Sequence, residues 1–321
     1  MIANKLVPMF AACMVIFAST LNAQTYPSQP IRMIVPYPPG GFTDLVSREV
    51  ASRLTSELGQ SVVVENRPGA GTNLAADLVS KAAPDGYTLL MGTSSLAINQ
   101  SLYSKVTYHP LKNLTPVGIF AATGYVLLAK TDGPYNTLND VIKAARSGAG
   151  KVSYGSSGNG AVNHLAGELF AASAGVTLLH VPYKGSQAAL VDLGGGRIDL
   201  FFSSVLEGLP QIQSGRVIGL GTTTSGPIAQ LPKLDPIGKT LRGYEVLFWM
   251  GLFAPEGISD PILARLTSAL KTIGQSASFD QWLAQRGAQP SWLSPEDARK
   301  LIAREIDTWG QAVKASGARV D

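Results

Sequence analysis

The chain contains few cysteines, histidines and charged residues, and each shortage excludes certain kinds of site or fold. Its 321 residues include one cysteine, Cys13, and three histidines. A single cysteine forms no disulfide within the chain and no cysteine-based metal site, so packing alone must stabilise the fold. Charged residues make up 15% of the chain, below the usual quarter. This favours a fold that buries most of its elements, as parallel sheets covered by helices do.

An excess of one charge and long apolar runs are also lacking. Lysine and arginine total 26 and aspartate and glutamate 22, with no run of like charge. Nucleic-acid binding normally needs a basic stripe, so we expect no nucleic-acid partner. An apolar content of 45% excludes disorder for most of the chain. After the N-terminal segment, no stretch reaches the roughly 18 apolar residues of a membrane span.

The N-terminal segment predicts export. Lys5 precedes an almost wholly apolar stretch from Leu6 to Leu21, and Ala23 follows as a small residue before Gln24. This layout is typical of a secretory signal peptide, and the apolar stretch is short for an anchor. We expect cleavage after about Ala23 and a periplasmic protein. Cys13 lies inside the apolar stretch, in a context that fits lipidation poorly.

The rest of the chain alternates strand-like and helix-like segments, over a length typical of two domains. Short apolar or β-branched runs predict strands at 31–35, 61–65, 87–92, 125–130, 152–155, 177–181, 198–202 and 217–222. Helical spacing of apolar residues predicts helices at 45–58, 74–83, 138–147, 162–174, 187–193, 261–273, 279–286 and 295–315. The order indicates an α/β protein with parallel sheets, in two units followed by a helical tail.

Two glycine-rich loops each join a predicted strand to the next helix, at 36–44 and 154–160. Ligands of open α/β sheets bind at the carboxyl ends of strands. Glycine lets the backbone approach a ligand, and the start of a helix offers unpaired N–H groups that suit a carboxylate or phosphate. Either loop alone is equally an ordinary turn, with Thr43 or Asp44 as helix cap. Two loops in matching positions favour a shared cleft, with hydroxyls from 92–95 beside the first.

Nucleotide-binding motifs fail when their positions are counted. A dinucleotide fingerprint that starts at Gly158 meets Asn163 where glycine or alanine is required. The sequence at 238–240 (GKT) looks like the end of a phosphate-binding loop, but its first glycine is replaced by Lys233.

Catalytic and metal sites have weak support. No Gly-x-Ser-x-Gly elbow surrounds Ser157, so a dyad with His164 is the only hydrolase reading. His164 and Glu168 are one helical turn apart, which favours an ordinary side-chain contact over a metal site. We therefore expect no enzyme activity, no cofactor and no metal.

Several short stretches stand in a fixed order along the chain. They are 36–41 (PYPPGG), 64–71 (VENRPGAG), 83–90 (APDGYTLL), 164–170 (HLAGELF), 180–185 (HVPYKG) and 243–245 (GYE) with Trp249. Together they resemble the Bug, or TctC-like, extracytoplasmic solute receptors of tripartite tricarboxylate transporters. The resemblance runs from about Tyr26 to the C-terminus; it is specific for the family and unspecific for the ligand.

The resemblance implies the type II periplasmic binding protein fold, in which a hinge joins two doubly wound α/β domains like a Venus flytrap. Its boundaries would be a signal peptide at 1–23, a discontinuous domain 1 at 24–124 and 246–321, and domain 2 at 125–245. Such a monomer captures a small dicarboxylate, tricarboxylate or aromatic carboxylate in the interdomain cleft. It then delivers the ligand to membrane permease subunits. A sensor for a signalling partner and a serine hydrolase using Ser157 are the alternatives.

The resemblance also implies a set of ligand-binding residues, with one carboxylate held largely by backbone N–H groups. Phe42 would favour an apolar or aromatic ligand body, and the neutral Ser203 gives less support to an ammonium-bearing ligand. Asp44 and His164 also have a simple structural explanation, as a helix cap and a partner of nearby backbone. The implied set is Pro39, Gly40, Gly41, Phe42, Thr43, Asp44, Ser94 and Ser95 on one wall, and Ser156, Ser157, Asn159, Gly160, His164, Tyr183, Lys184, Gly185 and Ser203 on the other.

Overall fold

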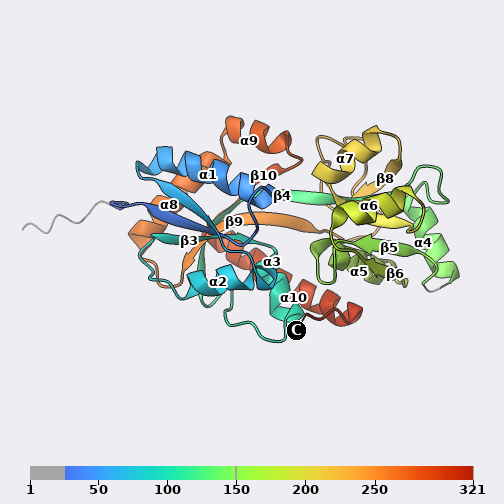
Figure 1. The fold of residues 1–321 in the computed structure, drawn as a ribbon, viewed down its shortest axis with the longest axis horizontal. Helices are drawn as coiled ribbons and strands as arrows, with labels where there is room; N and C mark the ends of the chain where they lie inside the picture. The colour runs from blue at the N-terminus through green and yellow to red at the C-terminus, as the bar shows by residue number, and fades with distance from the viewer. Residues whose placement is uncertain (1–25, 149, 321) are drawn as a thin grey trace, which may run out of the picture.

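Two groups of strands and helices lie side by side along the long axis of the molecule (Figure 1). The structure is a computed structural model that describes residues 26–148 and 150–320. The predicted signal peptide and Cys13 lie outside the described residues.

The first group is built on three parallel strands, β1 (Ile31–Val35), β2 (Val62–Asn66) and β3 (Thr88–Thr93), in the order β2-β1-β3. The strand and helix positions predicted here are confirmed within a few residues. An additional helix, α3, follows β3 where the sequence suggested only a turn. The helices of this group are α1 (Phe42–Leu58), α2 (Asn73–Ser80) and α3 (Ser95–Leu102), with a short 3-10 turn at Ala70–Thr72.

The second group repeats this plan with β5 (Ser153–Ser156), β6 (Leu179–Pro182) and β7 (Leu200–Ser204), parallel in the order β7-β5-β6. Strand β8 (Val217–Thr222) joins this group through a shared antiparallel partner, the strand β4 (Leu114–Lys130), which also pairs with β7. Its helices are α4 (Leu138–Ser147), α5 (Val162–Ala174), α6 (Ser186–Gly194) and α7 (Val205–Gln213), with a 3-10 turn at Ile237–Lys239.

Two antiparallel strands connect the groups; the sequence predicted only 125–130 of the first and did not predict the second. β4 (Leu114–Lys130) pairs with β9 (Leu247–Pro255) as far as Gly124, and from Tyr125 onward it pairs with β7 and β8. A short strand, β10 (Gln289–Leu293), also pairs with β4. The predicted parallel sheets are therefore parts of one mixed ten-stranded sheet.

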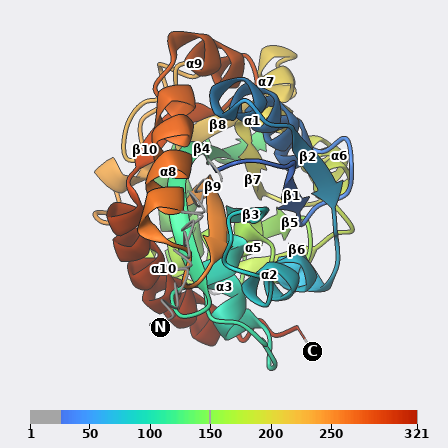
Figure 2. The same ribbon diagram turned by 90° about the vertical axis from the view of Figure 1, so that its left-hand side faces the viewer.

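Buried strands explain why both faces of the sheet carry helices. Met33 of β1 packs in one cluster with residues of α1 and α8 (Asp260–Gly274), whereas its neighbour Ile34 packs with α2, α3 and α10 (Pro295–Ser316). Successive side chains of a strand point to opposite faces, so both faces must be covered. Seen along the long axis, helices flank the sheet on both sides (Figure 2).

Three helices close the chain: α8 (Asp260–Gly274), α9 (Ala277–Ala284) and α10 (Pro295–Ser316). Helix α10 begins at the N-cap Ser294, whose side chain accepts the N–H of Asp297, and has proline at its first turn. It contacts α3 of the first group and α5 of the second, so it spans both groups.

Candidate ligand-binding site

Two adjoining cavities lie between the two groups of elements. Cavity A has a volume of about 540 Å³ and cavity B of about 430 Å³. Tyr37, Pro38 and Phe248 line both, so the two cavities meet at these residues. Cavity A is lined by Tyr37, Pro38, Pro39, Gly41, Phe42, Thr43, Thr123, Tyr125, Ser204, Leu206, Glu207, Phe248 and Arg286.

Cavity B brings the two predicted loops to one space. Pro36–Pro38, which follow β1, and Ser157–Gly160, which follow β5, line it together. The loop at 68–72 and helix α3 complete its wall. Its lining residues are Pro36, Tyr37, Pro38, Pro68, Gly69, Gly71, Thr72, Ser95, Ile98, Asn99, Leu102, Tyr103, Ser157, Gly158, Asn159, Gly160, Ala161, Val162, Phe248 and Val320.

Two helices start at these cavities without a side-chain cap. The N-cap of α1 is Gly41 and that of α5 is Ala161, and neither offers a side-chain acceptor. Within the described chain, the N–H groups of Phe42 and Val162 have no hydrogen-bond partner. Such unpaired N–H groups, together with the positive end of the helix dipole, favour an anion.

Asp44 fixes the first loop through bonds to both of its carboxylate oxygens. Its side chain is buried, and one oxygen accepts the N–H of Gly40 at 2.9 Å and Arg48 Nε at 3.0 Å. The other oxygen accepts Asn66 Nδ2 at 2.8 Å. Burial raises the pKa of the Asp44 carboxyl, but the bonds from Arg48, Gly40 and Asn66 outweigh it and hold the pKa below its usual value.

A pair of histidines, His164 which is buried and His180 which is half-buried, supports the second loop. The N–H of Gly160 donates to His164 Nδ1 at 3.0 Å, and Ser156 Oγ lies 2.6 Å from His180 Nε2. The two imidazole rings stack with centroids 3.8 Å apart. Burial lowers the pKa of each to about 4, so both are neutral hydrogen-bond partners near pH 7.

Eight of the predicted site residues line a cavity. Pro39, Gly41, Phe42 and Thr43 line cavity A, and Ser95, Ser157, Asn159 and Gly160 line cavity B.

Nine of the predicted residues line neither cavity. Gly185 and Tyr183 bond through their backbone N–H groups to the carbonyls of Ser157 and Ser156, so they flank the second loop from outside. Lys184 is exposed. Ser203 is buried, and its hydroxyl donates to the carbonyl of Ser204. The neighbouring residue Ser204 lines cavity A in its place. The nine are Gly40, Asp44, Ser94, Ser156, His164, Tyr183, Lys184, Gly185 and Ser203.

Sequence reasoning missed most of cavity A. Thr123, Tyr125 and Phe248 lie on the crossing strands β4 and β9, and Glu207 and Arg286 lie on α7 and just after α9. No local motif marks these positions. Of the cavity A residues absent from the predicted set, Tyr37 and Pro38 alone lie in a predicted loop, the first glycine-rich loop at 36–44.

Part of the cavity B wall is backbone in an unusual conformation. Ala70 and Thr72 have φ of +46° and +87°, in the left-handed region that disfavours side chains. The amide nitrogen of Asn99 donates to the carbonyl of Gly71 at 2.7 Å and to Asn73 Oδ1 at 2.8 Å, which holds the loop in place. Local strain of this kind collects at functional sites.

The contacts of Ser157 give a serine hydrolase no support. Its hydroxyl donates to Asn163 Oδ1 at 3.0 Å, and no hydrogen bond joins it to His164 in the described chain. The serine that does reach a histidine is Ser156, which is fully buried. His164 Nε2 lies 3.8 Å from Glu168 Oε1, the contact that the helical spacing predicted.

No group of three or more metal-binding side chains gathers anywhere within 26–148 and 150–320. None of the helices in those ranges has the length and apolar character needed to cross a membrane.

Comparisons with known proteins agree with this architecture. The family model described as "Tripartite tricarboxylate transporter family receptor", TctC, matches residues 46–318. Protein BugT of Bordetella pertussis is 34% identical over 94% of this chain and 94% of its own length.

Solved structures show the same fold. The structure of Rpa4515 from R. palustris with adipate is 33% identical, covers 91% of this chain and 98% of its own, and has a TM-score of 0.76. MatC from Rhodopseudomonas palustris with bound malate is 29% identical, covers 90% and 100%, and has a TM-score of 0.72. The predicted periplasmic-binding-protein fold is confirmed, and the chain belongs to the TctC family of tripartite tricarboxylate transporter receptors, which includes the Bug proteins.

Proposed function

We propose that this protein is exported to the periplasm, captures a small carboxylate in cavities A and B, and leaves it chemically unchanged. One observation carries the proposal: two helices begin without side-chain caps at adjoining cavities between the two groups. Solved relatives were determined with adipate and with malate, which are carboxylates.

Main-chain N–H groups supply the first point of attachment. Those of 41–43 lie at the start of α1, and those of Asn159 and Val162 lie before and at the start of α5. Ser95 and Ser157 add hydroxyls, and Asn159 adds an amide, beside cavity B. Hydrogen bonds from such donors to a charged carboxylate are shorter and stronger than those to a neutral acceptor.

Movement of two domains would couple binding to transport. We place domain 1 at 24–124 and 246–321 and domain 2 at 125–245, since β4 changes partners between Gly124 and Tyr125. A ligand that contacts both domains shifts the equilibrium toward a closed form. That closed monomer would then present the carboxylate to the membrane permease of a tripartite transporter.

Thermal unfolding of the mature protein with a panel of carboxylates tests this function. A ligand at about 100 times its dissociation constant should add roughly 2.7 kcal/mol of stability. The acid should be recovered intact after incubation. Absence of stabilisation by every acid would contradict the proposal. Turnover that disappears in Ser157→Ala would identify a hydrolase instead.

A further inference from the structure

Cavity A is larger and more aromatic than a single carboxylate needs. Its volume of about 540 Å³ is within the range of sites for complete small molecules. Tyr37, Phe42, Tyr125 and Phe248 provide flat walls around it. These rings suit the apolar body of a ligand whose acidic end lies at the helix starts.

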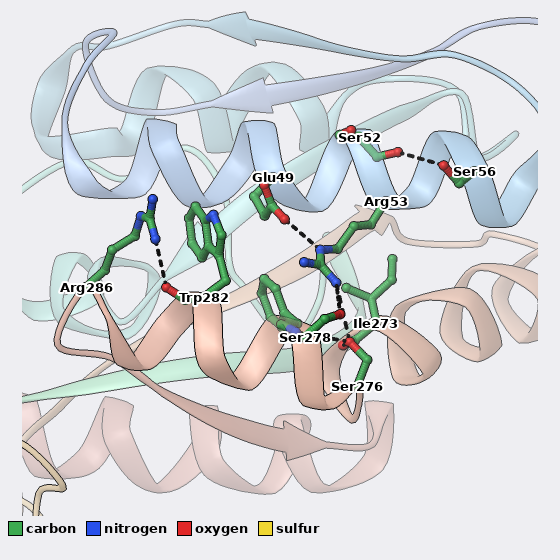
Figure 3. Close-up of polar contacts among 10 residues, drawn as sticks. Glu49, Ser52, Arg53, Ser56, Ile273, Ser276, Ser278, Trp282 and Arg286 are labelled. Carbon is green, nitrogen blue, oxygen red and sulfur yellow. Dashed lines mark hydrogen bonds and ion pairs between the residues drawn. The ribbon is translucent and has the colours of Figure 1, made fainter.

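Arg286 is the one positively charged residue among the described residues that line cavities A and B. Its Nη1 donates to the carbonyl of Trp282 at 3.0 Å, and its guanidinium lies 3.9 Å from the centre of the Trp282 ring. Figure 3 shows this side chain beside Trp282, between α9 and the neighbouring helix α1.

The remaining donors of Arg286 are available to a ligand. No described carboxylate lies within ion-pairing distance of its guanidinium. Stacking on Trp282 restricts the side chain before any ligand arrives, so less conformational freedom is lost on binding.

Glu207 is the one carboxylate that lines cavity A. It accepts the hydroxyl of Ser204 at 2.8 Å and lies in the first turn of α7, where the helix dipole stabilises negative charge. It makes no ion pair with Arg286 within the described chain. Its charge therefore opposes a second anionic group in this cavity.

We propose that Arg286 selects a dianionic acid with a flat apolar body. The first carboxylate binds at the starts of α1 and α5, the body lies against the aromatic walls, and the second anionic group binds the guanidinium. Glu207 weakens this second contact and so limits the affinity. The inference rests on the proposed function and adds the residue that binds the second anionic group of the ligand.

Titration calorimetry on the full mature protein tests the inference with two matched pairs of acids. Benzoate and benzene-1,4-dicarboxylate share an aromatic body, and hexanoate and adipate share an aliphatic one. A charged hydrogen bond contributes enough for a roughly ten- to hundredfold difference in affinity. We expect each diacid to bind more tightly than its monoacid by about that factor, and the aromatic pair to bind more tightly than the aliphatic pair.

Three variants assign the effect. Arg286→Gln should remove the advantage of the diacids and leave the monoacids unchanged. Glu207→Gln should strengthen diacid binding alone, because the opposing charge is gone. Arg53→Gln is the matched control: Arg53 also lies between α1 and α9, over the Phe279 ring, but it lines neither cavity and binds Glu49 and Ser278 (Figure 3). It should bind all four acids as wild type does.

The outcomes separate this inference from the proposed function. Equal wild-type affinity for monoacids and diacids, or an equal loss for both in Arg286→Gln, overturns the role of Arg286 while carboxylate binding stands. No binding of any of the four acids to wild type contradicts both. Melting curves of every variant show whether a loss reflects unfolding. If Arg286→Gln unfolds, Arg286→Lys, which keeps the charge but loses the planar fork, should retain only part of the diacid advantage.

Discussion

At the scale of single residues, Gly160 shows how a missing side chain lets the two groups approach. Its φ is +75°, and a Cβ there would lie 2.4 Å from Cδ2 of Leu102, in α3 of the opposite group. Its N–H is held by His164. Any side chain at this position both strains the loop and presses on the facing helix.

We therefore expect Gly160→Ala to weaken carboxylate binding at least tenfold and to lower the free energy of unfolding by about 1 kcal/mol. Calorimetry and urea unfolding measure the two effects. The matched control is Gly175→Ala at the end of α5, where φ is +62° and nothing lies within 4 Å of the added Cβ. Similar stability losses with equal affinities in both variants would show that Gly160 matters only for its conformation.

Some residues of the site could be predicted from the local sequence, and others could not. Gly41 and Gly160 were predictable because each lies between a strand and a helix, and the dipole and unpaired N–H groups follow from that order alone. Ser203 illustrates the limit. A register shift of one residue decides which of two neighbouring serines faces the cavity, and the structure turns Ser204 there.

At the scale of elements, prediction succeeded where a segment contains its own helix-start or helix-stop residues. Helix α5 ends at Gly175 in the left-handed conformation, and α4 begins with a capping box of Thr137 and Asp140. Strand β9 and helix α7 were missed for opposite reasons. Strand β9 is an apolar run without alternation, and α7 contains Pro210, which reads as a breaker.

The contact between β9 and α10 has a titratable group at its centre. Trp249 Nε1 donates to Glu305 Oε2 at 2.8 Å, and burial raises the pKa of Glu305 to about 7. Because the unfolded carboxyl has a pKa near 4.3, the folded state holds the proton more tightly. This contribution to stability is complete at low pH and is lost as pH rises through about 7.

Glu305→Gln should remove that loss, since the amide keeps a carbonyl oxygen for Trp249 and does not ionise. Urea unfolding between pH 5 and pH 8 should show a falling free energy for wild type that is flatter for the variant. Identical pH profiles would place the ionisation of Glu305 outside this range.

The histidine pair between β5, β6 and α5 acts in the opposite direction. His164 and His180 have a pKa of about 4 in the folded state, whereas unfolded histidine takes up a proton near pH 6.5. The unfolded state therefore binds more protons, and stability falls as pH drops from about 6.5 toward 4.

Acid unfolding of wild type and of His180→Gln checks this expectation. The variant should lose less stability between pH 6.5 and pH 4, although it starts lower because a packed ring is gone. Equal slopes would mean that His180 titrates normally and is not buried from solvent. The pKa of the third histidine, His109, is also lowered, by burial and by Lys112, but this residue is present in both proteins and does not affect the difference between their slopes.

At the scale of the whole molecule, the crossing strands explain why only part of the site was predictable. Local order placed the loops after β1 and β5, but Thr123, Tyr125 and Phe248 reach the cavities only because β4 and β9 run between the groups. The pairing of β4 with β9 joins residues more than a hundred positions apart, and no local pattern encodes it.

The same strands predict a measurable domain movement. The only cysteine lies in the predicted signal peptide, so cysteine pairs introduced into the mature chain can be labelled selectively. With labels at Leu74 in α2 and Gln187 in α6, both exposed, saturating carboxylate should shorten the distance between the groups. A pair within one group, Leu74 and Glu57, should keep its distance. If calorimetry shows binding while both distances stay constant, the ligand is held between groups that do not move, and closure cannot be the signal that the permease reads.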